Sequence, residues 1–323
     1  MSIIEEKGIS KTSFIFRLFP EFMHQIMRKI KGRRDYKRKK YYGKVILSDG
    51  KGNAKIADMI RKESHFMVAR FGDVELRTIV YYMMRKLRLK KRYPQYIRTA
   101  ICMNAGFFPD DENEIDKFGE LMLQSISQCD VLAVWFNLME GYIFKTFGPA
   151  DKTFISLDEL EPFLYDEPWS KYLEGKRVLV IHPFSESIER QYANKEKLFT
   201  NKCVLPSFQL FTIKAVQSIG GKSELYNSWF DALEYMYQEA MKIDFDIAII
   251  GCGAYGFPLA AKIKEHGKTA IHMGGVTQFL FGIKGGRWDS RPEYSKFYND
   301  YWIRPSDLEK PKDADKVENA CYW

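Results

Sequence analysis

Two carboxylates, Asp73 and Glu75, stand one residue apart, just after an apolar run that leads into Arg70 and Gly72. In an extended turn at the carboxyl end of a strand, both acids can point into one crevice. A divalent cation that bridges a diphosphate needs a few hard oxygen ligands of this kind and fills its other positions with phosphate and water. The same pair also fits the first turn of a helix beginning near Val74, where acids are favoured.

A second signal is an apolar strand that runs directly into Gly-x-Gly-x-x-Gly, whose glycines are Gly251, Gly253 and Gly256. Backbone amides in such a turn can approach a phosphate, and the N-terminus of the following helix favours negative charge. A dinucleotide fold places an acid about 20 residues on, but the next strand, 269–273, ends in two glycines instead. The pattern favours a nucleotide other than NAD or FAD, with a dinucleotide or a purely structural turn as alternatives.

A third group follows the strand-like run 178–182, where His182, Ser185 and Ser187 enter a polar loop. Open α/β sheets bind ligands at the carboxyl ends of their strands, so these side chains could line a crevice. His182 could act as a ligand or as an acid or base, although a single histidine is more often structural.

The last group is a glycine-rich segment, 272–288, which carries four groups able to donate hydrogen bonds: His272, Gln278, Lys284 and Arg287. Such groups suit a diphosphate or sugar hydroxyls, while the glycines alone could mean only loop flexibility. The sequence contains no Ser-His-Asp order, Walker A motif, HExxH motif or protein-kinase set.

The elements that must position these residues alternate along the chain. Short apolar runs predict strands at 45–47, 66–70, 99–103, 131–136, 153–156, 178–182, 247–250 and 269–273. Longer periodic segments predict helices at 54–62, 74–87, 113–127, 208–219, 229–242 and 259–265. Val- and Ile-rich strands separated by helical lengths predict an α/β fold with a largely parallel sheet and helices on both faces.

The charge of the 323-residue chain is unevenly distributed. The formal net charge is +8, yet residues 28 to 44 alone hold ten basic side chains and one acid, and residues 85 to 92 hold six basic ones. Everything outside these two segments is therefore mildly acidic, which excludes a uniformly basic nucleic-acid coat, and we expect no nucleic-acid partner. Five scattered cysteines without a CxxC pair and no apolar window near 18 residues predict a cytoplasmic protein.

The N-terminal region combines an apolar stripe with the larger basic cluster. From Leu18 to Ile30 the apolar residues follow one face of a helix, and the basic run begins before that helix ends. Such an amphipathic, basic segment predicts peripheral contact with an anionic membrane through residues 14–44, at the inner face of the cell membrane. The alternative is a helix packed on the body of the protein or on a partner, with a solvated basic tail.

Taken together, the ordered motifs resemble the GT-D fold glycosyltransferases, a family first described as a domain of unknown function. The resemblance covers most of the body and is carried by Ala69–Leu76, His182-Pro183-Phe184, Gly251–Gly256 with Pro258-Leu259-Ala260, Ile271–Gly275 with Gln278, Gly282–Gly285, Trp302–Pro305 and Cys321-Tyr322-Trp323. One departure is Val74, where the family often has glycine between the two acids.

The resemblance implies a Rossmann-like glycosyltransferase domain that takes a sugar from a nucleoside diphosphate donor, expected to be a UDP-sugar. The acceptor would be a growing glycan, which could be carried on a lipid, in bacterial surface-polysaccharide or glycoprotein synthesis. It also implies that Asp73 and Glu75 bind Mn²⁺ or Mg²⁺. The predicted catalytic residues are Asp73, Glu75 and His182. The predicted donor-binding residues are Arg70, Gly72, Ser185, Ser187, Gly251, Gly253, Tyr255, Gly256, His272, Gly274, Gly275, Gln278 and Lys284.

The predicted organisation has three parts: a basic N-terminal extension at 1–44, the glycosyltransferase-like domain at 45–305, and a polar tail at 306–323. Two other classes of function stay open at this point. One is a nicotinamide-dependent oxidoreductase built on the Gly251–Gly256 turn, and the other is a non-catalytic protein that binds membranes or polyanions through its basic segments.

Overall fold

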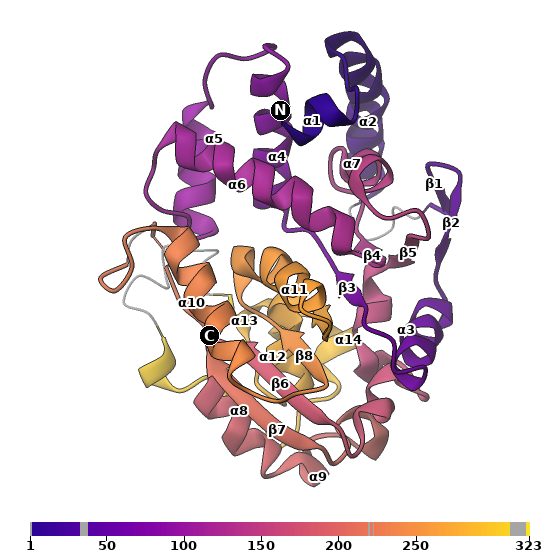
Figure 1. Ribbon diagram of the computed structural model, residues 1–323. Helices are drawn as coiled ribbons and strands as arrows, with labels where there is room; N and C mark the ends of the chain where they lie inside the picture. Colours follow the sequence, from indigo (N-terminus) through magenta and orange to yellow (C-terminus); the bar gives the residue numbers. More distant parts are fainter. Residues whose placement is uncertain (1, 33–37, 219, 222, 311–320) are drawn as a thin grey trace.

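The computed structural model describes residues 2–32, 38–218, 220–221, 223–310 and 321–323 (Figure 1). Within these residues a single sheet contains the strands β1 (Lys40–Tyr41), β2 (Lys44–Leu47), β3 (Met67–Ala69), β4 (Val131–Val134), β5 (Thr153–Ser156), β6 (Arg177–His182), β7 (Gln209–Lys214), β8 (Ile247–Ile250) and β9 (Thr269–His272). Their order across the sheet is β1-β2-β5-β4-β3-β9-β8-β6-β7. Only β1 and β2 pair in antiparallel fashion, so the predicted, mostly parallel α/β sheet is confirmed.

Helices connect these strands and cover both faces of the sheet. In the described part of the chain they are α1 (Ile3–Glu6), α2 (Lys11–Lys31), α3 (Lys51–Arg61), α4 (Asp73–Lys86), α5 (Gln95–Thr99), α6 (Glu112–Ser125), α7 (Glu140–Phe147), α8 (Ser185–Tyr192), α9 (Lys195–Leu198), α10 (Trp229–Met241), α11 (Gly256–Glu265), α12 (Thr277–Leu280), α13 (Gly286–Asp289) and α14 (Pro292–Ser295). None of these helices is both long enough and apolar enough to cross a bilayer.

The sheet separates two apolar cores because successive side chains of a strand point to opposite faces. In β6, Leu179 and Ile181 join a core formed with α4, α6, α7, α10 and α11. Val178 and Val180 of the same strand join a second core formed with α3, α8, α9 and α12–α14. Burial of the central strands on both faces explains why β3, β4 and β8 are continuous apolar runs in the sequence.

Two predicted elements are wrong. Residues 99–103, expected to form a strand, instead complete α5 and continue into the π-helical turn Ala100–Asn104. Pro94 caps this helix and Ile101 is buried against the first core, which shows that a short apolar run alone cannot distinguish strand from helix. The segment 208–219, expected to be helical, contains the edge strand β7, all six residues of which pair with β6.

Three predicted segments can be located only in part. Arg33, Arg34 and Lys37 of the basic cluster lie outside the described residues, as do residues 311–320 of the predicted tail. The last part of the predicted extension joins the sheet through β1, whose Tyr41 is buried in the first core. The three-part division of the chain stays a prediction.

Candidate active site

Four of the sequence motifs lie side by side because of the strand order. The strands β3, β9, β8 and β6 are consecutive neighbours and all run parallel, so the turns that follow them share one edge of the sheet. Arg70 follows β3, Gly274 follows β9, Gly251 follows β8, and His182 ends β6. Residues from four distant parts of the chain thus meet at the carboxyl edge.

Arg70 lies between the ends of β4 and β9. Its guanidinium carbon is 4.7 Å from the centroid of the Trp135 ring. On the other side, a Cβ atom added to Gly274 would lie 2.6 Å from Arg70 Nη1, and Gly274 has φ +71°, so only glycine suits this position. Arg70 Nε is buried without a hydrogen-bond partner, and Arg70 forms no ion pair with any described residue. A partly buried guanidinium without a carboxylate is suited to receive an anionic ligand.

Trp135 is fixed by hydrogen bonds on both sides. Its Nε1 donates to Phe71 O at 3.0 Å, and the backbone N–H groups of Trp135 and Phe136 donate to Glu140 Oε2 at 3.2 and 2.8 Å. Burial raises the pKa of Glu140 to about 8, against the lowering effect of these hydrogen bonds and of Arg28. Sequence reasoning missed Trp135, although an aromatic residue directly after a buried parallel strand was a usable signal.

A second buried carboxyl that sequence reasoning missed lies near Arg70. Glu161 Oε2 accepts a hydrogen bond of 2.6 Å from the Tyr294 hydroxyl. Burial raises the pKa of Glu161 to about 8, although Tyr294, Arg291 and Arg70 act to lower it. At neutral pH this carboxyl is mainly protonated, which leaves the Arg70 charge without a nearby carboxylate to neutralise it.

Asp73 and Glu75 lie in the first turn of α4 and not in an extended turn. Gly72 is the N-cap, and a Cβ atom there would overlap the Glu75 carboxylate, which therefore folds back over the start of the helix. Asp73 Oδ2 pairs with Arg77 Nη2 at 2.8 Å on the exposed side of the same helix. Positions i and i+2 of a helix lie about 200° apart around its axis, so the two acids leave α4 in different directions.

The donor set of this turn suits one kind of metal site. Carboxylates at a helix N-terminus are stabilised by the helix dipole and supply the hard oxygens that Mg²⁺ and Mn²⁺ prefer. The described residues contain no group of three or more His, Cys, Asp or Glu side chains that could hold a metal ion. Asp73 and Glu75 leave α4 in different directions and do not form an all-protein cage, so an ion held by either carboxylate would take most of its ligands from phosphate and water.

The two histidines of the site are buried and neutral. Burial lowers the pKa of both His182 and His272 to about 3, and the Arg70 charge adds to this for His272. His182 Nδ1 accepts a hydrogen bond of 3.0 Å from Phe184 N–H, and His272 Nδ1 lies 3.3 Å from Ile250 O. A histidine with so low a pKa is a weak proton acceptor at neutral pH, so the geometry favours hydrogen-bond donation through His182 Nε2 over the predicted base.

The three glycines of the Gly-x-Gly-x-x-Gly turn have different structural roles. A Cβ atom on Gly251 would lie 2.6 Å from His182 Cδ2, and one on Gly256 would overlap the His272 ring, so both serve close packing. Gly253 has φ +59° with open space beside it, which makes it the position where a phosphate could approach the backbone. The Tyr255 ring stacks on Trp229 in the core at a centroid distance of 4.7 Å, so only its backbone can face a ligand.

The serines after β6 lie under the C-terminal segment. Ser185 is buried at the start of α8. Ser187 Oγ donates to Glu309 Oε2, and Ser187 N–H donates to Glu309 Oε1 at 3.2 Å. A carboxylate of the chain itself thus takes the hydrogen bonds that Ser187 was predicted to give to the donor.

Gln278 and its neighbours hold the glycine-rich segment in place. Gln278 Nε2 donates to Lys284 O at 3.1 Å and to Tyr322 O at 3.0 Å, and its Oε1 is buried without a partner. A Cβ atom on Gly275 would overlap the Tyr322 ring. The Lys284 ammonium lies over the Tyr298 ring, 5.2 Å from its centroid. These contacts are those of a packed segment, with the Lys284 charge near its surface.

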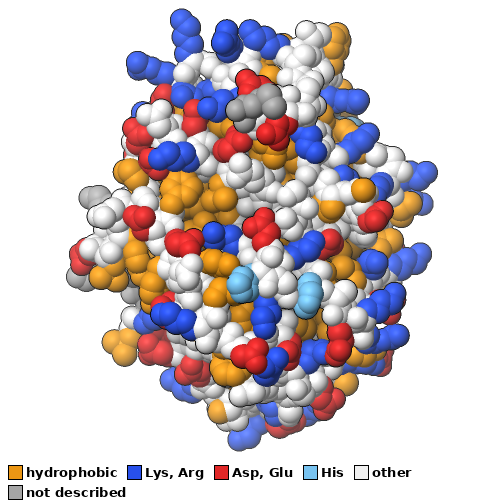
Figure 2. All heavy atoms as spheres, in the orientation of Figure 1, with side chains coloured by type: hydrophobic (Ala, Val, Ile, Leu, Met, Phe, Trp, Pro, Cys, Tyr) orange, Lys and Arg blue, Asp and Glu red, His pale blue; other side chains and the backbone are white. Residues whose placement is uncertain are grey.

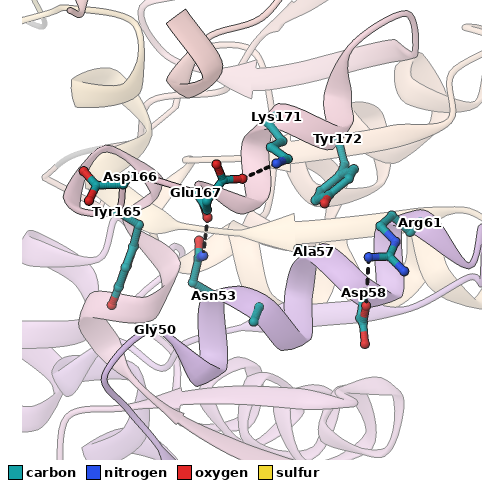
Figure 3. A pocket seen from close by; sticks show the side chains of 11 residues that line it. Gly50, Asn53, Ala57, Asp58, Arg61, Tyr165, Asp166, Glu167, Lys171 and Tyr172 are labelled. Atoms are coloured by element: carbon teal, nitrogen blue, oxygen red, sulfur yellow. Dashed lines mark hydrogen bonds and ion pairs between the residues drawn. The ribbon is translucent and has the colours of Figure 1, made fainter. Parts of the chain in front are cut away.

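A groove of about 360 Å³ lies apart from these residues, between α3 and residues 165–172 (Figure 3). Tyr165 and Tyr172 border it, and Asn53 Nδ2 donates to Glu167 O at 2.7 Å across its base. None of the predicted site residues lines this groove, so the site is built from the carboxyl-edge residues alone.

Comparisons with known proteins gave two matches. No protein-family model and no curated protein sequence matches the chain. One matching structure is described as "Selenomethionine substituted structure of domain of unknown function 1792 (DUF1792)", with 12% identity over 77% of this chain and 92% of that chain and a TM-score of 0.42. The other is described as "The highly conserved domain of unknown function 1792 has a distinct glycosyltransferase fold", with 12% identity over 78% and 92% and a TM-score of 0.40. Both are of the family that the motifs resemble.

Proposed function

We propose that this protein is a metal-dependent glycosyltransferase that transfers a sugar from a nucleoside diphosphate donor, a UDP-sugar in the first instance, to a glycan acceptor of bacterial surface-polysaccharide or glycoprotein synthesis. The observation that carries the proposal is Arg70, a partly buried guanidinium that forms no ion pair within the described residues at the edge where the motifs meet. The resemblance of the ordered motifs supports the choice of reaction.

The chemistry of sugar transfer explains why such a group is useful. When the anomeric C–O bond breaks, negative charge builds up on the departing diphosphate and positive charge on the sugar. The Arg70 guanidinium, held between Trp135 and Gly274, is already oriented and needs little reorganisation to stabilise that charge. The backbone at Gly253 offers amide groups to the same diphosphate.

Asp73 and Glu75 are the residues that would hold a Mn²⁺ or Mg²⁺ ion. When bound, the ion supplies Lewis-acid stabilisation of the diphosphate leaving group. Asp73 pairs with Arg77 in the first turn of α4, so this cation competes with a metal ion for the carboxylate. His182 keeps its place through the hydrogen bond from Phe184 N–H to Nδ1, which leaves Nε2 as the nitrogen that would carry the proton.

The test is a thermal-shift screen of UDP-, GDP-, CMP- and dTDP-sugars, each with and without Mn²⁺. A ligand that binds only the folded state raises its stability by mass action, so we expect a shift for one nucleotide class that grows with Mn²⁺. The same screen on Arg70→Ala should lose the shift, while Arg190→Ala, which removes an exposed arginine of α8, should keep it. Stabilisation by NADH alone would favour the oxidoreductase instead.

Transfer itself is then measured with the stabilising donor. Replacing both Asp73 and Glu75 by Ala should abolish the Mn²⁺ dependence of turnover and reduce its rate. Unchanged turnover in this double variant would overturn the metal assignment, and unchanged turnover in Arg70→Ala would overturn the proposed site.

A further inference from the structure

Helix α2 packs on the body of the protein through an unusual set of residues. Its buried positions are Phe14, Glu21 and Arg28, which recur every seven residues along one stripe. Glu21 Oε1 accepts a hydrogen bond of 2.6 Å from the Tyr42 hydroxyl. Gln25, on the same stripe, donates to Phe136 O at 2.8 Å. Polar contacts, the buried Phe14 and the partly buried Leu18 therefore hold this helix to the body.

The opposite side of α2 is apolar and faces solvent. We define the apolar face of α2 as Ile15, Phe16, Phe19, Phe22, Met23, Ile26, Met27 and Ile30. These eight are among the fourteen large hydrophobic residues that are exposed in the described part of the chain, so one helix carries more than half of them. Phe16 and Phe19 are 74% and 69% exposed. A contiguous apolar surface of this kind marks an interaction site, whereas isolated exposed apolar residues do not.

Basic residues border the apolar face on both sides. At 100° per residue, Lys11 and Lys29 lie along one border, and Arg17 and Lys31 lie beyond the other. The one acid of the helix, Glu21, is buried on the side that packs against the body. An apolar stripe between rows of basic side chains is the pattern of helices that lie in the plane of a membrane surface.

A second set of basic residues lies at the same end of the molecule. Figure 1 places α2 and the α4–α5 connection together at the top, and Figure 2 shows Lys and Arg side chains gathered along that end. In this connection Arg88, Lys90, Lys91 and Arg92 are exposed and form no ion pair with a described residue. This end of the molecule therefore carries basic side chains on the α4–α5 connection in addition to those of α2.

We propose that the apolar face of α2 docks on an anionic phospholipid surface. The eight apolar side chains would enter the boundary between headgroups and acyl chains, and the bordering lysines and arginines would contact the lipid phosphates. Charge complementarity favours an anionic lipid surface over a second copy of the chain. In a dimer, the basic residues that border the apolar face of one copy would lie against those of the other. The inference goes beyond the proposed function and does not depend on it.

The packing of α2 also connects this surface to the candidate active site. Arg28 Nη1 donates to Phe136 O at 3.2 Å and to Asn137 Oδ1 at 3.1 Å. These residues follow Trp135, the ring on which Arg70 rests. A membrane-bound α2 would thus hold the carboxyl-edge residues close to the lipid surface.

The experiment is vesicle flotation with the full chain and no sugar donor. One set of vesicles contains phosphatidylcholine alone, and the other contains equal parts of phosphatidylcholine and phosphatidylglycerol. The variants are F16S/F19S, which shortens the apolar face, and K29Q/K31Q, which removes border charge. Their matched controls are L225S/L308S, which replaces two leucines that are each 85% exposed elsewhere, and K51Q/K55Q, which replaces two exposed lysines of α3.

We expect flotation with the anionic vesicles only. K29Q/K31Q should weaken it by about 25-fold, at roughly fivefold for each basic residue, and F16S/F19S should weaken it at least as much, while both controls float like the wild type. Absence of flotation, or flotation that F16S/F19S leaves unchanged, would overturn the proposal. Light scattering gives the other decisive result: a dimer that F16S/F19S dissociates, without vesicle binding, would assign the face to a second copy of the chain.

Discussion

The two parts of the carboxyl edge differ in how their polar groups are satisfied. Around β3 and β4, Arg70 has no ion-pair partner among the described residues and Asp73 is partly exposed. Around β6, β8 and β9, His182 and His272 are buried and fill the space over Gly251 and Gly256. One part presents charge that a ligand could neutralise, and the other part is already packed.

This difference shows where function and stability reside at the edge. An unpaired, partly buried charge reduces stability, and such groups persist where a ligand supplies the missing partner. The glycine motif looked like the clearest binding signal in the sequence, yet two of its three glycines make room for histidine rings. The β3 side is therefore the better place to look for donor binding, with Gly253 as the contribution of the glycine turn.

The largest effect should come from Arg70→Ala. Removing a preorganised donor that stabilises developing negative charge typically lowers kcat by about 100- to 1,000-fold. Because Arg70 has no ion pair to lose within the described residues, the melting temperature should change little. Steady-state transfer assays and thermal unfolding, with Arg190→Ala as the control, check both expectations. A stable variant with full activity would show that the comparison between the two parts is wrong.

The packed part should respond to Gly256→Ala by losing stability. The added Cβ would overlap the His272 ring, and overpacking of this kind costs about 1–3 kcal/mol. Gly253→Ala is the matched change in the same turn. It meets no neighbour, although the positive φ still costs about 1–2 kcal/mol. Urea unfolding should show that both variants lose stability, whereas only Gly253→Ala should weaken donor binding. Unchanged stability together with weaker donor binding in Gly256→Ala would overturn the packing role assigned to Gly256.

The buried histidines give the packed part a pH signature. The unfolded chain takes up protons near pH 6.5, while the folded pKa of His272 is about 3, so the free energy of unfolding falls as the pH drops from 6.5 toward 3. Between pH 7 and pH 5 this amounts to about 2 kcal/mol for one histidine. Glu140 and Glu161, whose pKa values are raised to about 8, act in the opposite direction in this range. The measurement is therefore the pH dependence of the free energy of unfolding in His272→Gln, compared with that of the wild type.

In His272→Gln the destabilising effect of acid should be smaller by that amount, because the titrating ring is gone. The exposed His65 provides the control: His65→Gln should follow the wild-type pH profile. Equal pH profiles for His272→Gln and the wild type would mean that the ring is not buried in its neutral form.

Much of this fold could be predicted because its central strands are buried on both faces. Strands β5 and β8 have the predicted bounds, since each is a continuous run ended by polar or glycine residues. The edge strand β7 was mistaken for a helix because it pairs on one side only and carries a mixed pattern of exposed and buried residues. The strand predicted at 99–103 is wrong for a different reason: a π-helical turn can bury the same short apolar run as a strand.

The sequence indicated the individual motifs but not how they are arranged. The strand order brings Arg70, His182, Gly251 and Gly274 to one edge of the sheet, because parallel strands have their carboxyl ends together. Which groups are satisfied depends on contacts between distant segments, such as Glu309 on Ser187, and no local pattern reveals them. The direction of the apolar face of α2 depends in the same way on tertiary packing.

The smallest effect should come from Arg77→Ala, which tests whether Asp73 contributes to ligand binding on the β3 side of the carboxyl edge. The Arg77–Asp73 ion pair has side chains that are 47% and 35% exposed, and exposed pairs contribute only about 0.2–1 kcal/mol. Stability should therefore change little. The freed Asp73 carboxylate is no longer shared with a cation, so Mn²⁺ should bind more tightly in the presence of the donor, by up to about fivefold for a gain of similar size. Mn²⁺ titration of Arg77→Ala beside Asp73→Asn, which should bind more weakly than the wild type, measures this directly. If both variants bind Mn²⁺ like the wild type, Asp73 serves only as a helix-start residue, and Arg70 alone distinguishes the β3 side from the packed one.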